Sequence, residues 1–181
     1  MSGQQTIGVF CSSSDAVDRL YMDVATQLGM LLAQREWTLV YGGGCIGLMG
    51  ALARSVHAHG GKVVGVIPES MTHKPVVYEK ANELIVTKTM RQRKAIMDDR
   101  SDAFVVLPGG FGTLEELFEV IAHRQLRYHD KSVVIVNSAG FYDPLITLFD
   151  HIIEHQFAKA RHRKSYEVVA DPASAVSCLS E

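Results

Sequence analysis

The sequence predicts a single α/β domain with a doubly wound, mainly parallel sheet flanked by helices. Apolar segments of strand length alternate with amphipathic helical segments along the chain, which is the pattern of repeated βαβ units. Glycine-rich turns follow several of these strands and lead directly into helices. Such turns lie at the carboxyl edge of a parallel sheet, so this edge is the expected place for a ligand.

The expected strands are short apolar runs, beginning with Ile7–Phe10 and Thr38–Tyr41. The run Ala103–Leu107 is apolar throughout, as in a strand that is buried on both faces. In chain order the strands are expected to end near Phe10, Tyr41, Ile67, Val86, Leu107, Val136 and Val169.

Between the strands, apolar residues recur at helical spacing. After Thr113 they fall at Leu114, Leu117, Phe118, Ile121 and Ala122. Between Leu145 and Phe157 the expected buried stripe is Leu148, Phe149, Ile152 and Ile153. The predicted helices are Asp15–Gln34, Gly47–His59, Met90–Arg100, Thr113–Leu126, Pro144–His155 and Pro172–Leu179.

Composition indicates an ordinary globular protein. The 181 residues are 47% hydrophobic and 21% charged, with a formal net charge of −2, and residues 1–181 are expected to form one domain. Although Arg91, Arg93, Lys94 and Arg100 cluster, there is no long basic tract, so a small anion is the expected partner rather than a nucleic acid polymer.

The apolar runs are also much shorter than the ~20 residues of a membrane span, so no membrane partner is expected. Met1–Thr6 is polar and contains no signal-peptide core, which predicts a cytoplasmic protein. The cysteines, Cys11, Cys45 and Cys178, are widely separated and form no C-x-x-C pair, so we expect reduced thiols rather than a disulfide framework or a zinc site.

The most informative segment is Pro108–Glu116, with the sequence PGGFGTLEE, between an apolar strand and an amphipathic helix. Glycine lets the backbone approach a ligand closely, and the helix start offers unpaired N–H donors and the positive end of the helix dipole. The segment therefore predicts a phosphate-binding loop with carboxylates next to it.

Two further strand ends carry candidate ligand loops. Gly42–Gly50 follows Thr38–Tyr41, and Cys11–Ser14 follows Ile7–Phe10 with hydroxyl groups that suit phosphate or ribose oxygens. Gly42, Gly44 and Gly47 fit a bare G-x-G-x-x-G spacing, but no acidic residue stands in a clear ribose-binding position, and no G-x-x-x-x-G-K-[ST] motif is present. The glycines of this run either contact a ligand or let a helix pack closely on the sheet. If the three loops converge, the site has the size of a nucleotide.

Thr113 and Glu116 allow two interpretations. Their T-x-x-E spacing is that of a capping box, in which both side chains satisfy backbone donors at a helix start. Alternatively, a phosphate occupies those donors and the Glu116 carboxylate faces the ligand. Arg93 and Lys94 likewise belong either to a solvated helix face or to an anion clamp, with Arg93 and Glu116 paired across one pocket.

Two other patterns carry less weight. His151–His155 matches H-x-x-E-H, a metalloprotease pattern, but the expected apolar stripe leaves these side chains on the outer side of the helix and no third ligand is evident, so no metal site is expected. Cys11 and Cys45 lie in candidate ligand loops, where a nucleophilic role competes with simple packing of a small residue.

The segment Pro108–Glu116 fits P-G-G-x-G-T-x-x-E, and Met90, Arg93, Lys94 and Met97 precede it. With these motifs the chain resembles the LONELY GUY (LOG) cytokinin-activating proteins, once labelled lysine decarboxylase-like. The resemblance extends from Phe10–Ser13 to the last helix. It implies a Rossmann-like homodimer that hydrolyses the N-glycosidic bond of N6-substituted adenosine 5′-monophosphates, giving free base and ribose 5-phosphate.

The resemblance implies that Arg93 and Glu116 are catalytic and that no cofactor or metal is needed. It implies a phosphate loop at Gly109, Gly110, Phe111, Gly112 and Thr113, and further substrate-binding positions at Ser12, Ser13, Gly43, Gly44, Lys94, Met97, Leu114 and Glu115. Relatives often carry an acidic residue two positions after the strand-end proline, for which Glu69 or Ser70 is the candidate substitute, and often a histidine at Arg91.

The expected chemistry agrees with these residues. Cleavage of a ribosyl C–N bond builds positive charge on the sugar, which a carboxylate stabilises, and a carboxylate also deprotonates an attacking water. The chain has no lysine whose context suggests a Schiff base with pyridoxal phosphate. The competing prediction is a non-catalytic nucleotide or cofactor carrier of the same fold, which would need the phosphate loop but no carboxylate at the glycosidic bond.

Overall fold

The structure is a computed structural model that describes residues 4–180. The strands are β1 (Thr6–Phe10), β2 (Thr38–Tyr41), β3 (Val63–Pro68), β4 (Glu83–Thr87), β5 (Ala103–Val106), β6 (Val133–Val136) and β7 (Glu167–Val169). The helices are α1 (Arg19–Gln34), α2 (Gly47–Ala58), α3 (Glu69–Thr72), α4 (Met90–Arg100), α5 (Phe111–Gln125), α6 (Asp143–Glu154) and α7 (Pro172–Cys178). Two 3₁₀ turns, η1 (Ser138–Gly140) and η2 (Ala160–Ser165), complete the order.

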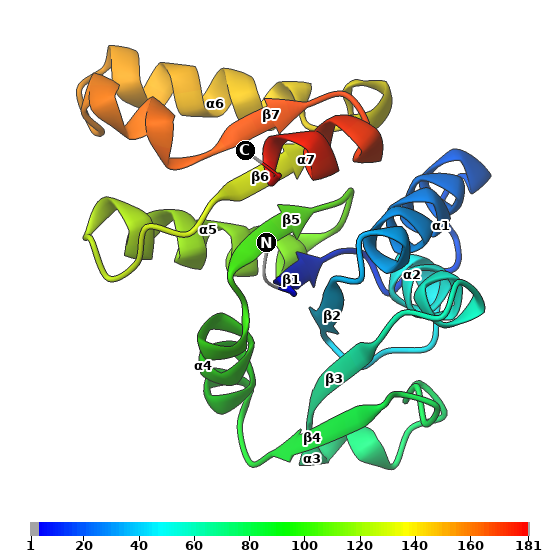
Figure 1. Ribbon diagram of the computed structural model, residues 1–181. Coiled ribbons are helices and arrows are strands. Elements are labelled where there is room, and N and C mark those ends of the chain that lie inside the picture. Colours follow the sequence, from blue (N-terminus) through cyan, green and yellow to red (C-terminus); the bar gives the residue numbers. More distant parts are fainter. Residues whose placement is uncertain (1–3, 181) are drawn as a thin grey trace.

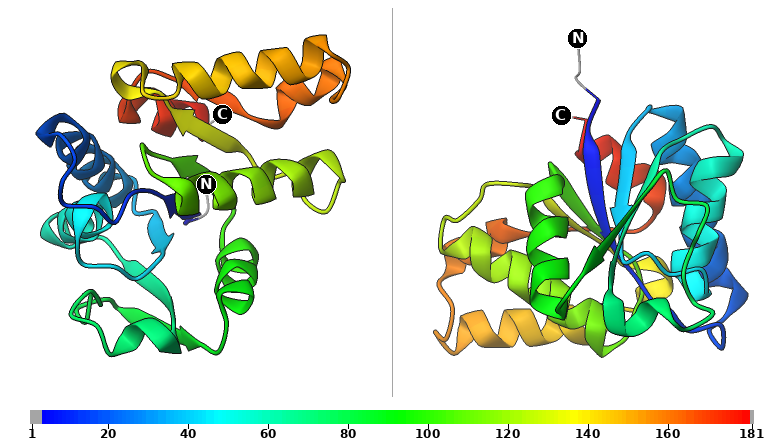
Figure 2. Two further views of the ribbon diagram at one scale, coloured as in Figure 1. Left: turned by 180° about the vertical axis from the view of Figure 1, so that it is seen from behind. Right: turned by 90° about the horizontal axis from the view of Figure 1, so that it is seen from below.

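The seven strands form one sheet in the order β4-β3-β2-β1-β5-β6-β7, and each neighbouring pair is parallel. Helices α1, α2 and α7 cover one face, and α4, α5 and α6 cover the other (Figures 1 and 2). The predicted doubly wound α/β fold is therefore confirmed. The prediction that residues 1–181 form one domain stays a prediction, because residues 1–3 and 181 lie outside the described residues. The predicted polar segment Met1–Thr6 is therefore described only in its second half.

The core consists of two apolar layers, one on each face of the sheet. Leu28, Leu32, Leu52 and Val56 bring α1 and α2 onto the first face. Met97, Leu117, Ile121 and Phe149 bring α4, α5 and α6 onto the second. Strands β5 and β6 are fully buried, which agrees with their continuous apolar sequences. No helix within residues 4–180 is long and apolar enough to cross a membrane.

The chain reverses its direction of winding at β1. Strands β2, β3 and β4 extend the sheet on one side of β1, whereas β5, β6 and β7 extend it on the other. The loops after β1 and β5 therefore leave towards opposite faces, and their backbones are joined by a hydrogen bond from Ser12 N–H to Pro108 O, 3.2 Å long. This topological switch point is where open α/β sheets bind their ligands.

The predicted helix boundaries hold within two residues, with one exception. Helix α1 begins at Arg19 instead of Asp15, because Asp18 caps it by accepting from Leu20 N–H at 2.9 Å. Asp15 instead accepts from Gly47 N–H at 2.7 Å and so serves the start of α2. The short α3, η1 and η2 were not predicted.

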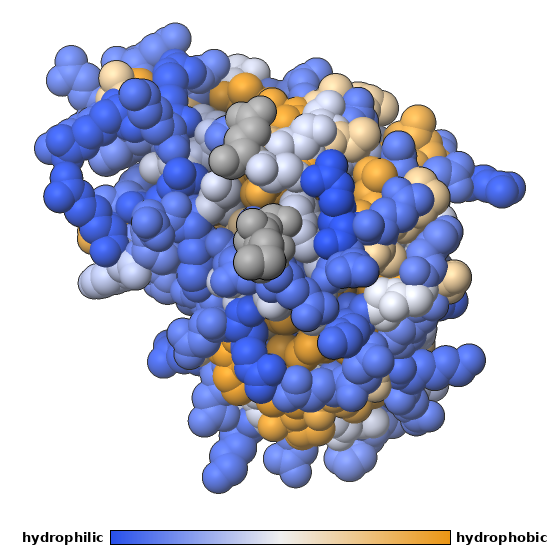
Figure 3. Space-filling view, viewed as in Figure 1, coloured by the Kyte–Doolittle hydropathy of each residue, from blue (hydrophilic) through white to orange (hydrophobic). Residues whose placement is uncertain are grey.

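The expected buried stripe of α6 is wrong in part, because Leu148 is 47% exposed. Two members of the expected α5 stripe, Phe118 and Ala122, are likewise exposed. They line an apolar groove between α5 and α6. Apolar side chains are also exposed on the edge strand β4, at Leu84 and Val86 (Figure 3).

Candidate active site

A cavity of about 520 Å³ lies at the carboxyl edge of the sheet. Its lining comes from the loops after β1, β2, β3 and β5 and from the helices α4 and α5. The polar lining consists of Ser12, Ser13, Ser14, Lys74, Arg93, Thr113 and Glu116, together with the glycines Gly42, Gly44, Gly110 and Gly112. The predicted convergence of three strand-end loops on one crevice is confirmed.

One end of the cavity is the start of α5. The N-cap residue is Gly110, which has no side chain to accept from the first N–H groups of the helix. These donors are therefore available to an anion, at the positive end of the helix dipole. Gly109 leaves space for the buried side chain of Thr113, because a Cβ at Gly109 would lie 2.1 Å from Thr113 Oγ1.

Arg93 reaches the cavity from α4, where Thr89 caps the helix and accepts from Gln92 N–H. Its side chain is buried although it is charged. Its Nε donates to Val66 O at 3.1 Å, and its Nη2 lies 3.5 Å from Glu116 Oε1. Gly42 makes this position possible, since a Cβ there would lie 2.0 Å from Arg93 Nη2.

Glu116 lies one turn inside α5 and is 7% exposed. Burial raises the pKa of its carboxyl to about 7, although the positive charge of Arg93 acts in the opposite direction. A carboxylate with such a pKa exchanges protons near neutral pH, as a general base or acid requires.

Cys11 also lines the cavity, but it is completely enclosed. Burial and the neighbouring Glu116 carboxylate raise the pKa of this thiol far above its usual range. Because the thiolate is the reactive form, Cys11 is a poor nucleophile, and its role is packing.

The apolar part of the lining, referred to below as the apolar wall, consists of Ile46, Met49, Ile67, Met71, Val76 and Met90. The segment between α3 and β4 forms part of this wall and is fixed to the glycine run after β2. Cys45 N–H donates to Val76 O at 2.7 Å, and Tyr78 N–H donates to Gly43 O at 2.9 Å. The apolar wall suits contact with a flat ring or an apolar chain.

The cavity brings together part of the predicted site: Ser12, Ser13, Gly44, Arg93, Gly110, Phe111, Gly112, Thr113 and Glu116. Phe111 stands at the rim and is 92% exposed. The remaining predicted residues do not line it. Gly43 packs on β3. Met97 lies in the core, and Leu114 packs against that core. Gly109 lines a different, neighbouring cavity. Lys94 and Glu115 form an ion pair with each other outside this cavity.

The sequence reasoning missed the residues that come from the segment after β3. Met71, Lys74 and Val76 line the cavity, whereas Glu69 and Ser70 are exposed and do not. One signal in the sequence could have identified them: this segment follows a predicted strand, just as the glycine run does, so both were expected at the same edge of the sheet. Gly42 was noted in the sequence as part of that run, but its role in making space for Arg93 depends on α4, far along the chain.

The capping-box interpretation of Thr113 and Glu116 is wrong. Helix α5 begins at Phe111, two residues before the predicted start, so Thr113 and Glu116 lie within the helix. The predicted basic cluster is also divided among different partners. Arg93 contacts Glu116, Lys94 contacts glutamates of α5, and Arg100 pairs with Glu83 at 3.0 Å.

The H-x-x-E-H segment is exposed, with the His151 and His155 rings 4.2 Å apart. Within residues 4–180, no group of three or more histidine, cysteine, aspartate or glutamate side chains is arranged to hold a metal ion.

Known proteins resemble this chain in sequence over most of its length. Residues 49–179 match a protein family described as possible lysine decarboxylase. The cytokinin riboside 5′-monophosphate phosphoribohydrolase LOG2 of Arabidopsis thaliana is 45% identical over 158 residues, which cover 87% of this chain and 74% of the relative. The probable phosphoribohydrolase LOGL9 of Oryza sativa is 46% identical over 173 residues, covering 96% and 76%. The chain belongs to the LOG family.

Solved structures show how widely the fold of this LOG family member occurs. A molybdenum cofactor binding protein from Rippkaea orientalis has a TM-score of 0.76 at 21% identity, covering 99% of this chain and 98% of its own. A Moco carrier protein from Chlamydomonas reinhardtii has a TM-score of 0.74 at 22% identity, covering 98% and 96%. At such identities the likeness concerns the fold alone.

Proposed function

We propose that this chain hydrolyses the N-glycosidic bond of N6-substituted adenosine 5′-monophosphates, such as isopentenyladenosine monophosphate, to free base and ribose 5-phosphate. The observation that carries the proposal is the buried Arg93–Glu116 pair inside a cavity of nucleotide size. The named activity of relatives that are about 45% identical supports the same reaction.

The phosphate would bind to the N–H groups at the start of α5, from Gly110 to Thr113. Glu116 follows one helical turn later, roughly 5 Å along the axis. This spacing is comparable to the length of a ribose with its 5′ carbon. A phosphate held at the loop would therefore bring the anomeric carbon towards the Glu116 carboxylate, and binding energy from the phosphate would position the reacting bond.

In this proposal the charge of the Glu116 carboxylate stabilises the positive charge that develops on the ribose as its bond to the base breaks, and the carboxylate then takes a proton from the water that adds to the anomeric carbon. Arg93 holds that carboxylate in place. Its Nε is fixed by Val66 O, so the guanidinium keeps one orientation while Nη2 faces Glu116. The proton that Glu116 takes from the water passes to the departing base, directly or through solvent, so that free base and ribose 5-phosphate are released and the carboxylate is regenerated.

The apolar wall of the cavity supports an N6-substituted base. Met49, Met71 and Met90 are flexible side chains that adapt to a ring or a branched chain, and Ile46, Ile67 and Val76 complete the wall. We therefore expect isopentenyladenosine monophosphate to react with a higher kcat/KM than AMP.

The test is chromatographic detection of free base after incubation of the purified protein with AMP and with isopentenyladenosine monophosphate. Release of base, faster from the N6-substituted nucleotide, is the expected result. Binding of both nucleotides without release of base would contradict the proposal and favour a carrier or sensor of the same fold.

We also propose that the protein is a homodimer and acts in the cytoplasm. The apolar groove between α5 and α6 has a volume of about 340 Å³ and is bordered by Phe118 and by Phe157, which is 87% exposed. Apolar patches of this kind mark protein interfaces, and a second copy of this chain is the proposed occupant.

The proposed location in the cytoplasm agrees with the free thiols of Cys11 and Cys45, which suit a reducing compartment. Cell fractionation tests this location.

A further inference from the structure

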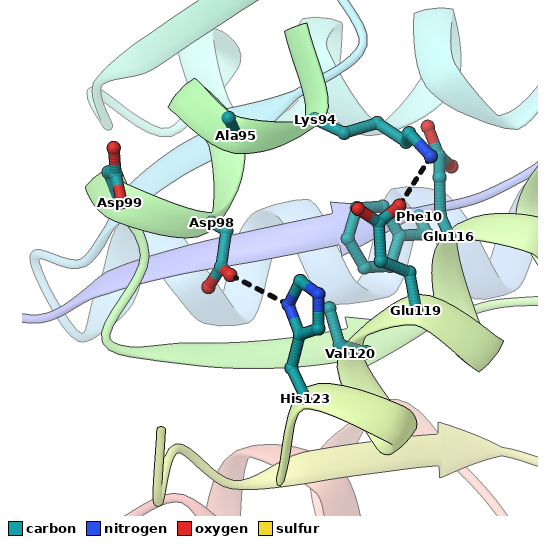
Figure 4. A pocket seen from close by; sticks show the side chains of 9 residues that line it. All are labelled: Phe10, Lys94, Ala95, Asp98, Asp99, Glu116, Glu119, Val120 and His123. Atoms are coloured by element: carbon teal, nitrogen blue, oxygen red, sulfur yellow. Dashed lines mark hydrogen bonds and ion pairs between the residues drawn. The ribbon is translucent and has the colours of Figure 1, made fainter. Parts of the chain in front are cut away.

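A second, smaller cavity lies behind Glu116, between α4 and α5 (Figure 4). Its volume is about 140 Å³, and Lys94, Asp98, Glu119 and His123 are among the side chains that line it. Of the residues that line the nucleotide cavity, Glu116 alone also lines this rear cavity. The Glu116 carboxylate is thus influenced by charges on both of its sides.

The part of α5 beside this cavity is strongly acidic, with Glu116 and Glu119 in its lining and Glu115 next to it. Glu115, Glu116 and Glu119 fall within five consecutive positions, and Glu116 and Glu119 are three residues apart, on the same side of the helix. Carboxylates so close together disfavour one another's ionisation. Positive charge from α4 is therefore needed if Glu116 is to act as a base near neutral pH.

Two residues of α4 supply that charge. Arg93 approaches Glu116 from the nucleotide side. Lys94 is on the rear side, where its Nζ contacts Glu119 Oε2 (Figure 4). The same Nζ also contacts Glu115 Oε1. The Lys94 side chain is only 15% exposed, so its ammonium group is held close to the carboxylates instead of extending into solvent.

We propose that Lys94 is a positioning residue for catalysis: anchored by Glu115 and Glu119, it supplies positive charge to the Glu116 carboxylate from the rear cavity. This inference rests on the proposed function, since it concerns the base of that reaction. Glu119, in turn, holds Lys94 in place but adds a negative charge of its own near Glu116.

The other charged groups around Glu116 support this assignment. On α4, Asp98 lines the rear cavity, but its carboxylate is paired with Lys131 at 2.9 Å and with His123 of α5 at 3.4 Å. Asp99 of α4 is a further carboxylate in the lining of this cavity and supplies no positive charge. The Cys11 thiol, after β1, stays protonated because burial raises its pKa. Arg93 and Lys94 are therefore the cations that offset the carboxylates of α5.

The ionisation of the cluster agrees with the geometry. Burial acts to lower the pKa of Lys94, but the hydrogen bonds and charges of Glu115 and Glu119 outweigh it, so the pKa is raised and the ammonium stays charged. The charge of Lys94 acts to lower the pKa of Glu116, whereas Glu115 and Glu119 act to raise it.

The test compares pH profiles of kcat/KM for wild type, Lys94→Met and Glu119→Gln. Lys94→Met should move the acid limb of the profile, where kcat/KM falls with falling pH, to higher pH by about one unit. At pH values well below this limb, kcat/KM should be roughly tenfold lower than in wild type, whereas most activity should remain on the alkaline plateau, where the profile is level. Glu119→Gln removes a negative charge and should move the limb to lower pH. Lys94→Arg should leave it nearly unchanged, and Lys88→Met, at an exposed lysine before α4, is the matched charge control.

The same variants are compared by NMR titration of protein labelled at the glutamate side-chain carboxyl carbon, with Glu116→Gln to assign the Glu116 signal. This measures the pKa of Glu116 directly, so it tests Lys94 even if the wild type releases no base and the proposed function fails. If Lys94→Met does not fold, Lys94→Gln, which keeps a polar side chain but removes the charge, tests the inference by the same shift to higher pH. An unchanged Glu116 pKa, or a loss of plateau activity without a shift of the limb, would overturn the role of Lys94.

Discussion

Glycine at position 42 provides space that another residue of the site occupies. A Cβ at Gly42 would meet the Arg93 guanidinium, which is the far end of a flexible side chain and can move aside. A methyl group at Gly42 should therefore change the geometry of the Arg93–Glu116 pair more than it changes the stability of the fold.

We expect Gly42→Ala to lower kcat about tenfold or more, because small displacements of an orienting group cost much rate, while the melting temperature changes little. Steady-state kinetics and thermal unfolding measure the two effects. The matched test is Gly42→Ala in an Arg93→Ala background, where it should have little further effect on kcat. Full additivity of the two changes would show that Gly42 does not act through Arg93.

The pH dependence of the reaction should follow Glu116. Its pKa is raised to about 7, and the base must be ionised, so kcat/KM should rise with pH, reach half of its maximum near pH 7 and fall about tenfold per unit below it. Rates measured from pH 5 to 9 with isopentenyladenosine monophosphate test this. A profile that is flat from pH 5 to 7 would exclude Glu116 as the titrating base.

At the scale of elements, α4 positions two adjacent side chains, Arg93 and Lys94, on either side of Glu116. The helix is also fixed at its carboxyl end. Lys131, just before β6, donates to Asp98 Oδ1 at 2.9 Å and to Asp98 O at 2.5 Å. Burial acts to raise the pKa of Asp98, but the hydrogen bond and charge of Lys131 outweigh it, so the pKa is lowered.

A carboxyl group whose pKa is lowered by folding stabilises the fold above its unfolded pKa of about 3.8, and this stabilisation is lost as the pH falls through the lower folded value. Lys131→Met should therefore reduce the free energy of unfolding by about 1–3 kcal/mol at pH 7. The deficit should shrink in acid, as Asp98 becomes protonated. Denaturant unfolding at pH 7 and pH 3 measures both values, and an equal deficit at the two pH values would contradict the assignment.

The elements also show what could be predicted from the sequence. The doubly wound parallel sheet and the approximate bounds of its helices follow from apolar periodicity and right-handed crossovers, and α4 was predicted with its observed bounds. The strand order was not predicted, and the buried stripes of α5 and α6 were predicted only in part. The start of α5 was not, because T-x-x-E is a strong local cap signal, whereas Gly110 starts the helix and leaves the donors open. The wall built by Met71, Lys74 and Val76 depends on hydrogen bonds to Gly43 and Cys45, about 30 positions away, which no local pattern encodes.

At the scale of the whole molecule, two apolar surfaces could join copies of the chain: the α5–α6 groove at Phe118 and Phe157, and the β4 edge at Leu84 and Val86. The groove is concave and, unlike the β4 edge, carries exposed aromatic side chains, with Phe118 41% and Phe157 87% exposed. An edge strand, in contrast, can pair with a second copy through its backbone.

We expect Phe157→Asp to convert a dimer to a monomer, because a charge in an apolar interface is left desolvated and unpaired. Val86→Asp, which adds the same charge at the β4 edge, should leave the dimer intact. Light scattering coupled to size-exclusion chromatography gives the molar mass of each variant. A wild type that is monomeric, or a dimer that only Val86→Asp dissociates, would contradict the assignment of the groove.

The central claim is that the Glu116 carboxylate, held by Arg93, cleaves the glycosidic bond. The most direct test measures release of free base from isopentenyladenosine monophosphate by wild type and Glu116→Gln, together with calorimetric binding of the same nucleotide to the variant. We expect the variant to lose roughly 100- to 10,000-fold in kcat while it still binds the nucleotide. Turnover by Glu116→Gln at a rate near that of wild type would contradict it.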